Sequence, residues 1–360
     1  MKQSHRLNNV GLINRDKVIK FNFNGKSYQG YEGDTLASAL LANGEHLVGR
    51  SFKYHRPRGF FGAGVDEPNA KLQVTINGHS EPNINATEIE LVDGLSATSQ
   101  NCWPSVEFDI GAINNFLKRF FPAGFYYKTF MWPKSFWYKV YEPFIRKAAG
   151  LGVASLEKDK ERYEHKFEYC DLLVTGSGPS GLASAYAAAK NGAKVILAED
   201  KPRYGGTLLT DDVSIDNMSG KDWSEKIISE LKTMPNVTLK NRSQVFGYYD
   251  HNMMVMFERV GDHLSNKSKY TPRQRLWYIR AKETILSTGS IERPIVFGNN
   301  DTPGVVLSSA AKEYMKVYGV LVGRKPIIFT NNDSAYETAF EFKKNNVEPI
   351  ILDTREEHGS

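Results

Sequence analysis

A glycine-rich turn between an apolar run and an alanine-rich run limits the folds that this chain can adopt. Residues 171–175 read Asp-Leu-Leu-Val-Thr, the turn at 176–181 reads Gly-Ser-Gly-Pro-Ser-Gly, and residues 179–190 have the composition of a helix. A second apolar run at 194–198 ends just before Glu199. A strand, a helix and a second strand in this order form a βαβ unit, which builds a parallel sheet with a right-handed crossover. The sequence therefore predicts a Rossmann-type α/β domain.

The spacing of the three glycines predicts a dinucleotide site. Gly176 permits a tight turn, Gly178 lets a pyrophosphate approach the backbone, and Gly181 allows the helix to pack closely on the strand. The N-terminus of the helix then supplies N–H groups for the phosphates. Glu199 would accept hydrogen bonds from ribose hydroxyls and repel a 2′-phosphate, which favours NAD or FAD over NADP. NAD and FAD both remain open, and the alternative is a glycine-rich turn that binds nothing.

Two later segments are expected to border the same site. Gly205-Gly206-Thr207 follows the acidic residue, and Thr288-Gly289 ends the apolar run that begins at Thr284, although each also reads as an ordinary turn or strand end. No metal-ligand spacing and no Ser-His-Asp arrangement is evident, so no catalytic or metal-binding residue is assigned. The predicted cofactor-binding residues are Gly176, Gly178, Pro179, Ser180, Gly181, Glu199, Asp200, Gly206, Thr207, Thr288 and Gly289.

The remaining patterns predict four segments. Residues 1–110 form a small β-rich domain, in which Asn24-Gly25 turns a hairpin and Asn77-Gly78 follows another strand. A helix is predicted to start at Asp34 or Thr35, to run through 36–42 and to stop at Asn43-Gly44. Residues 111–168 form a connector of aromatic helices that ends in a charged helix or linker. The predicted segments are 1–110, 111–168, a dinucleotide-binding domain at 169–322, and the start of a second βαβ unit at 323–360.

Within the dinucleotide-binding domain, we expect an inserted antiparallel layer. Its strands are predicted at 237–240, 243–249, 253–259, 275–282 and 284–288. In the second βαβ unit, Thr330-Asn-Asn-Asp-Ser334 has no glycine and carries an acid where a phosphate would lie. That unit is therefore not expected to bind a dinucleotide phosphate, and Asp333 or Ser334 is expected to cap its helix. We expect one of two explanations for the unfinished sheet of this unit. Either further residues follow in the native protein and complete it, or Gly359-Ser360 marks a cloning boundary.

Composition narrows the classes of partner. The chain has 46 Lys and Arg against 41 Asp and Glu, without a block of like charges, so nucleic acid is not an expected partner. Its two cysteines, Cys102 and Cys170, are too few for a disulfide framework, which fits a reducing, cytoplasmic compartment. No secretory signal and no membrane span are expected, because Gly, Ser and Pro break the uncharged stretch at 172–189.

Two segments leave alternatives open. The basic loop at 51–59 could grip a cofactor phosphate or a partner subunit, or it could be a solvated basic loop. The aromatic stretch at 116–144 could dock on a partner, or it could pack internally between domains.

Several blocks together resemble the α subunit of heterotetrameric sarcosine oxidase. They are the run Arg50 to Gly59, the fingerprint Gly176 to Gly181, and the segments 286–294, 299–304 and 329–336. The resemblance implies a ferredoxin-like fold for the N-terminal domain, but residues 57–65 contain no cysteine, so no iron-sulfur cluster is expected there. Opine oxidase and hydrogen cyanide synthase subunits carry cluster cysteines in or beside this region, so their absence favours the sarcosine oxidase family.

The resemblance also implies cofactors and partners. It implies NAD in the glycine-fingerprint domain, FAD being the alternative, with the amine-oxidising flavin in a β subunit, and with an FMN near the α–β interface. The implied partners are the β, γ and δ subunits of a complex that converts sarcosine to glycine, peroxide and formaldehyde or methylenetetrahydrofolate. These residues do not match the family's folate-binding C-terminal half, so folate binding is not expected of them. The isolated chain is not expected to catalyse the oxidation of sarcosine by itself. The alternatives are a stand-alone FAD-dependent oxidoreductase and an amine oxidase subunit of the opine or cyanide synthase type.

Overall fold

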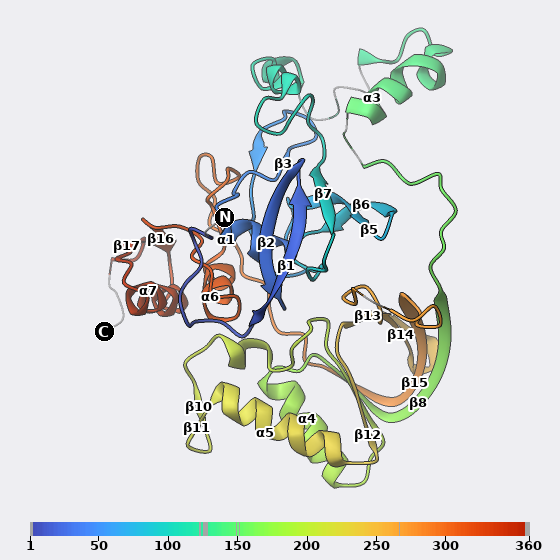
Figure 1. Ribbon diagram of the computed structural model, residues 1–360, viewed down its shortest axis with the longest axis vertical. Helices are drawn as coiled ribbons and strands as arrows, with labels where there is room; N and C mark the ends of the chain where they lie inside the picture. Colours follow the sequence, from blue (N-terminus) through green and yellow to red (C-terminus); the bar gives the residue numbers. More distant parts are fainter. Residues whose placement is uncertain are drawn as a thin grey trace. The chain divides into compact units, whose positions relative to one another are not determined.

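The computed structural model describes residues 3–121, 124, 129–148, 150, 152–265 and 267–356 (Figure 1). The chain forms two compact units, one comprising residues 1–158 and 292–360 and the other residues 159–291. The sequence predicts domain boundaries at residues 110, 168 and 322, which remain predictions. The compact units group the C-terminal residues with the N-terminal ones.

The first unit contains a five-stranded sheet in the order β2-β1-β7-β5-β6 (Figure 1). Asn24 and Gly25, both with positive φ, join the first two strands as the sequence predicts. The predicted helix at 36–42 is also present: Thr35 caps its N-terminus, Gly44 follows with a φ of 86°, and every helical residue is buried. The elements are β1 (Asn14–Phe23), β2 (Lys26–Glu32), α1 (Leu36–Ala42), β3 (Gly49–Arg50), β4 (Pro57–Arg58), β5 (Lys71–Ile76), β6 (His79–Asn85) and β7 (Ser96–Ser99).

A buried ion pair joins three parts of the first unit. The Arg6 guanidinium donates to both oxygens of Asp34, at 3.0 and 2.7 Å, and to the carbonyl of Tyr318 at 2.7 Å. The Asp34 side chain is fully buried, and it also accepts from the Tyr31 N–H and the Ser38 hydroxyl. Because both charges are desolvated, removing either partner leaves the other buried and unpaired.

Both arginines of the basic loop at 51–59 are paired within the first unit. Arg56 donates to both Asp301 oxygens at 2.7 Å and to Asn299, and Arg58 also binds Asp301. These bonds hold the pKa of Asp301 well below its ordinary value. Gly59 lies so close to Pro303 that an added Cβ would be 2.8 Å from its Cα. The two blocks at 50–59 and 299–304 are thus one packed structure, whose own carboxylate satisfies the arginines.

The loop that follows β4 is organised around a buried carboxylate. Glu67 is 2% exposed and accepts the N–H groups of Phe61, Gly62, Asn69 and Ala70 at 2.5–3.1 Å. Burial raises the pKa of this carboxyl group, and the four backbone hydrogen bonds oppose the rise. The loop is therefore held together by hydrogen bonds from its backbone to its own Glu67 carboxylate.

The C-terminal part of the first unit contains the second βαβ unit that the sequence predicts. β16 (Ile327–Thr330) pairs in parallel with β17 (Ile350–Asp353) across α7 (Ser334–Lys344), which packs beside α6 (Ser308–Lys316). The cap differs from the prediction. Asp333 precedes the helix without a side-chain cap bond, because its backbone is already helical (φ −77°, ψ −21°), whereas a capping residue ordinarily has an extended backbone. Asn332 Oδ1 instead accepts the N–H of Ser334 at 3.0 Å.

The helical elements in the described residues of the aromatic connector are short. They are η1 (Ile110–Asn115), η2 (Lys118–Phe120), η3 (Trp137–Tyr141) and α3 (Glu142–Ala148). The charged run that was expected as a helix or linker at 157–166 contains no helix, and β8 already begins at Tyr163. The strand predicted at 171–175 is thus the end of a longer one.

The second unit is a six-stranded sheet in the order β12-β9-β8-β15-β14-β13, with β12, β9, β8 and β15 parallel. Side chains alternate between its faces: Leu172 and Val174 pack with the helices, and Leu173 packs in a separate cluster on the other side. The elements are β8 (Tyr163–Thr175), α4 (Pro179–Lys190), β9 (Val195–Ala198), η4 (Gly206–Leu209), β10 (Ser214–Ile215), β11 (Met218–Ser219), α5 (Gly220–Thr233), β12 (Val237–Lys240), β13 (Ser243–Tyr249), η5 (Asp250–Asn252), β14 (Met253–Arg259) and β15 (Gln274–Leu286).

Part of the inserted layer differs from the prediction. β13, β14 and β15 do form an antiparallel meander, but β12 pairs in parallel with β9. The helix α5, which the sequence analysis missed, supplies the crossover that a parallel neighbour requires. The two strands predicted at 275–282 and 284–288 are one strand, β15, because both halves pair with β8.

Across the described residues, no helix combines the length and apolarity needed to cross a bilayer.

We predict that Arg6→Met lowers the free energy of unfolding by about 3–5 kcal/mol, because Asp34 is left buried and unpaired. Lys17→Met is the matched control, since Lys17 and Glu32 form an ion pair whose side chains are 60% and 45% exposed. The control should change stability by less than about 1 kcal/mol. Urea denaturation of both variants measures the difference, and equal effects would contradict the role assigned to Arg6.

Glu67→Ala should destabilise the first unit by about 3 kcal/mol or more, because four backbone donors lose their acceptor. Glu107→Ala is the control, because that side chain is 56% exposed and lies 3.7 Å from Lys26. Thermal unfolding followed by circular dichroism compares the two variants. A Glu67→Ala protein as stable as the control variant would show that the loop does not depend on this carboxylate.

Candidate functional site

The glycine turn lies at a switch point of the parallel sheet. From β8 the chain crosses through α4 to β9 on one side, whereas β15 pairs with β8 on the other side. Thr175 at the end of β8 is in register with Ala198 on β9 and with Leu286 on β15. The carboxyl ends of three strands therefore meet at one edge, where α/β sheets of this type bind their ligands.

The backbone of the turn approaches its neighbours too closely for side chains. Gly176 has a φ of 97°, and an added Cβ would lie 2.2 Å from the Ser287 carbonyl oxygen. A Cβ on Gly181 would lie 1.9 Å from the Gly176 oxygen. Gly178 differs, since nothing lies within 4 Å of the position of its Cβ. The turn is thus tightly packed at both ends and open in the middle.

The open middle coincides with the N-terminus of α4. Gly178 is the N-cap residue and has no side chain to cap the helix, and Pro179 occupies the first turn. Ser180 is exposed on the same turn. The first N–H groups of a helix have no acceptor within the helix and carry its positive end. This end of α4 can therefore receive an anion.

Glu199 lies at the end of β9 and contacts the turn. Its Oε2 accepts the N–H of Ser177 at 2.9 Å and the Ser177 hydroxyl, and its Oε1 accepts the N–H of Lys201 at 3.0 Å. The residue is only 5% exposed. Burial and the neighbouring Asp200 carboxyl group raise the pKa of Glu199 to about 7. An added hydroxyl donor would favour its ionised form.

The two later segments also reach the turn. The Gly205 N–H donates to Ser177, and an added Cβ on Gly206 would lie 2.9 Å from the Gly178 Cα. Thr288 and Gly289 follow β15 and are exposed, and a Cβ on Gly176 would lie 3.5 Å from the Thr288 Cα. Thr207 is exposed in η4, and its carbonyl accepts N–H groups from the residues that follow η4 rather than from the turn.

The sequence analysis did not single out two residues of this arrangement. Ser177, fully buried, connects the turn to both Glu199 and Gly205. Ser287 brings its carbonyl against Gly176, and its N–H donates to Thr175 at 2.8 Å. A small polar residue between the first two glycines was the only signal for Ser177, and nothing in the sequence marked Ser287.

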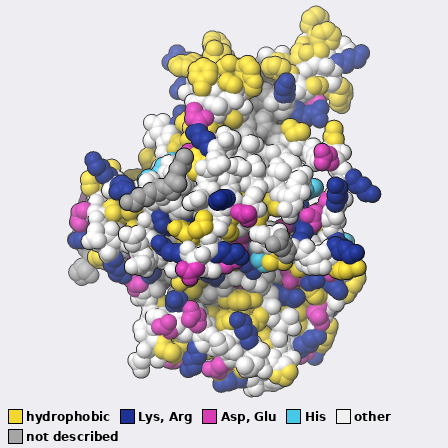
Figure 2. Space-filling view, in the orientation of Figure 1, with side chains coloured by type: hydrophobic (Ala, Val, Ile, Leu, Met, Phe, Trp, Pro, Cys, Tyr) yellow, Lys and Arg dark blue, Asp and Glu magenta, His cyan; other side chains and the backbone are white. Residues whose placement is uncertain are grey.

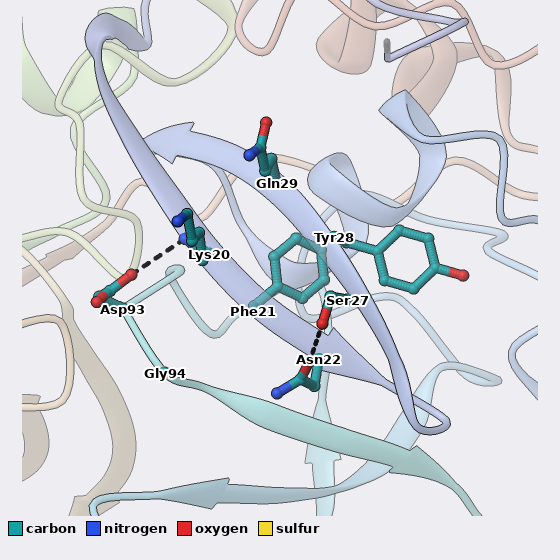
Figure 3. Close-up of a pocket in the computed structure, with 8 residues that line it drawn as sticks. All are labelled: Lys20, Phe21, Asn22, Ser27, Tyr28, Gln29, Asp93 and Gly94. Atoms are coloured by element: carbon teal, nitrogen blue, oxygen red, sulfur yellow. Dashed lines mark hydrogen bonds between the residues drawn. The ribbon is translucent and has the colours of Figure 1, made fainter. Parts of the chain in front are cut away.

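A pocket in the first unit lies outside this arrangement. It is lined by residues of β1 and β2 together with Asp93 and Gly94 (Figure 3). The Asp93 carboxylate accepts the backbone N–H of Lys20 at 3.1 Å, and the Ser27 hydroxyl donates to Asn22 at 2.9 Å. Two of the polar groups that Figure 3 draws, the Asp93 carboxylate and the Ser27 hydroxyl, thus bond within the lining itself, and the glycine turn remains the candidate site.

Two family models match the chain. A 2Fe-2S iron-sulfur cluster binding domain matches residues 16–102, and an FAD dependent oxidoreductase matches residues 171–254. The first region does not suit a cluster, because residues 16–102 contain one cysteine, Cys102, where such clusters need four protein ligands. Glu67 already occupies the backbone donors of the loop. The second region contains the glycine turn and Glu199.

Curated relatives match across both of these regions. The sarcosine oxidase α subunit of Rhizobium meliloti (strain 1021) is 51% identical over 98% of this chain and 36% of the relative. The corresponding protein of Corynebacterium sp. (strain U-96) is 33% identical over 96% of this chain and 31% of the relative. The chain thus spans about a third of the length of these relatives. An opine oxidase subunit of Agrobacterium tumefaciens (strain Ach5) is 27% identical over 45% of this chain and 33% of the relative.

Among solved structures, L-proline dehydrogenase from P. horikoshii superposes with a TM-score of 0.65 at 21% identity, covering 99% of this chain and 57% of that chain. This likeness supports the mixed fold, with a ferredoxin-like domain and a Rossmann-type domain. The two sarcosine oxidase α subunits match 98% and 96% of this chain at 51% and 33% identity. This chain therefore belongs to the sarcosine oxidase α subunit family.

Proposed function

We propose that the turn at 176–181 holds the pyrophosphate of NAD. One observation carries the proposal: at the switch point of the parallel sheet, the turn is closed to side chains at Gly176 and Gly181 but open in front of Gly178. The uncapped N-terminus of α4 faces that opening with its first N–H groups. A pyrophosphate is the anionic group that this combination suits best.

Glu199 is proposed to bind the adenosine ribose, and Asp200 to lie beside it. The Glu199 carboxylate contacts the turn itself and accepts hydrogen bonds without donating any when ionised. A ribose with two free hydroxyls would donate to it, whereas a 2′-phosphate would be repelled. Gly206, Thr207, Thr288 and Gly289 are proposed to border the remainder of the cofactor, from η4 and from the end of β15.

FAD is the second candidate, because the family model that matches residues 171–254 is that of an FAD dependent oxidoreductase. FAD presents the same adenosine ribose and pyrophosphate, so the contacts of the turn would be the same. Either cofactor would supply hydride chemistry, and this chain's residues would bind and orient it.

The chain is further proposed to act within a sarcosine oxidase complex. The relatives at 51% and 33% identity are named as α subunits of that enzyme. We propose β, γ and δ subunits as partners, sarcosine as substrate, and a second flavin at a subunit interface. The segments 1–110, 111–168, 169–322 and 323–360 are proposed as its domains. The isolated chain is expected to bind its dinucleotide without oxidising sarcosine.

Isothermal titration with NAD, FAD and NADP tests the cofactor assignment. We expect NAD to bind with one site per chain and NADP to bind at least tenfold more weakly, because Glu199 repels its extra phosphate. Binding of FAD alone would replace NAD with the second candidate. The absence of binding by all three would reject the dinucleotide site.

The substitution Gly178→Ala tests whether the turn binds the cofactor, and it is expected to leave the fold intact. The backbone of Gly178 has a φ of −66°, and its Cβ position is open, so stability should change by less than about 0.5 kcal/mol. The added methyl group would fill the proposed pyrophosphate position, and affinity should fall at least tenfold. Gly298→Ala is the control, because its Cβ position is equally open. If Gly178→Ala binds as the control does, the turn is not the cofactor site.

Glu199 makes binding depend on pH. Burial raises the pKa of Glu199 to about 7, so its carboxyl group is mostly protonated at pH 6. Ribose hydroxyl donors favour the ionised form, so binding lowers this pKa and releases a proton. Affinity should therefore rise with pH, by about tenfold between pH 5.5 and 8 for each unit by which the pKa falls. In Glu199→Gln this rise should vanish, and titration in buffers of different ionisation enthalpy measures the released proton.

A further inference from the structure

The 3-10 helix η1 and the residues around it turn their apolar side chains toward solvent. Ile110, Ile113 and Phe116 recur at intervals of three, which places them on one face of a helix of this type. They are 49%, 59% and 85% exposed, and Phe120 is 75% exposed. A surface helix ordinarily directs its apolar face to the core. In this segment the apolar side chains face solvent instead.

Small and polar residues anchor this segment from the other side. The Asp109 carboxylate binds His55 at 2.6 Å and accepts the N–H groups of Trp103 and Gly111. A Cβ on Gly111 would lie 2.3 Å from the His55 ring, and the Asn114 amide donates to a backbone carbonyl at 3.3 Å. The aromatic side chains are thus exposed on a backbone that is held in place.

A second group of exposed aromatic residues lies further along the connector. Trp132, Tyr138 and Phe144 are 83%, 82% and 69% exposed. Tyr141 packs 5.2 Å from the ring of Phe130, and its hydroxyl donates to the Trp132 carbonyl at 2.8 Å. Figure 2 shows hydrophobic side chains gathered at the end of the molecule where Figure 1 draws α3, with Lys and Arg among them. Most of the surface of these three side chains is therefore open to solvent.

The charges around these aromatic side chains are mainly positive. Lys118 and Arg119 stand between Phe116 and Phe120, and Lys134 and Lys139 flank the second group. The carboxylates near these aromatic residues in the sequence already have partners: Asp109 binds the His55 ring, Glu142 binds Arg146, and Glu107 lies 3.7 Å from Lys26. A partner surface that complements the connector would therefore be apolar at its centre and acidic at its rim.

We propose that the exposed aromatic residues of 103–120 and 131–144, here termed the aromatic face, dock a partner subunit with such an apolar and acidic surface. The inference rests on the proposed function, which supplies the partner subunits. Exposed apolar side chains that gather on the surface of a soluble domain mark interaction sites. A membrane is the less suitable partner, because the described residues between Ile110 and Tyr141 form the short segments η1, η2 and η3 and no continuous amphipathic helix.

Co-expression of this chain with sarcosine oxidase β, γ and δ subunits tests the proposal. Phe116→Asp and the double variant Lys118→Glu/Arg119→Glu alter the aromatic face, and Tyr270→Asp is the control, since Tyr270 is 67% exposed in the other unit. We expect Phe116→Asp to weaken assembly by about 30-fold or more, the size of a hot-spot loss. The charge variant should weaken assembly most at low salt, and the control should assemble as the wild type does.

The same samples distinguish a failure of the docking proposal from a failure of the proposed function. Dinucleotide content is measured in each, and it should be unchanged in Phe116→Asp. If Phe116→Asp assembles normally with normal dinucleotide content, the aromatic face is not the docking surface, and the proposed function stands. If the wild-type chain assembles with none of the subunits, the proposed function fails and the inference fails with it. Binding to vesicles of phosphatidylserine and phosphatidylcholine, or a Phe116-dependent dimer in light scattering, would assign the face to a membrane or to a second copy instead.

Discussion

The contact between the turn after β8 and the end of β15 is the constraint on which the candidate site depends. Ser287 donates its N–H to Thr175, and its carbonyl oxygen leaves room for nothing beyond hydrogen at Gly176. This contact fixes where β8 ends and therefore where α4 begins. The helix N-terminus, the Glu199 carboxylate and the Gly205 backbone are then positioned around one opening, because each is bonded to the turn through Ser177 or follows it directly.

In the first unit, carboxylates of the chain itself accept the hydrogen bonds of two loops. Its fold is that of a domain that in other proteins binds a 2Fe-2S cluster, yet a glutamate carboxylate accepts four backbone donors of the loop. In the neighbouring block, the Asp301 carboxylate pairs with both Arg56 and Arg58. Backbone and side-chain donors that could have served an external anion are satisfied internally. The donors of these two loops are therefore already used, whereas the first N–H groups of α4, in the second unit, have no acceptor within their helix and no side-chain cap.

Patterns of local chemistry predicted much of this structure. The Asn24-Gly25 hairpin, α1 with its cap at Thr35 and the βαβ unit around Gly176 each follow from a turn, a cap or a period that neighbouring residues determine. Long-range partners could not be predicted in the same way. That Asp301 binds Arg56, that β12 pairs with β9, and that Asn332 replaces Asp333 as the cap all depend on tertiary contacts. The exposure of Phe116 likewise depends on which face Asp109 and Asn114 anchor.

The central claim is that an adenine dinucleotide, NAD, belongs to the turn at 176–181. The most direct measurement is to denature the purified chain and to identify the released cofactor by absorbance and mass. NAD in a ratio near one per chain, without flavin, is the predicted result. Stoichiometric FAD without NAD would contradict it and would require the chain to be assayed alone as a flavoenzyme.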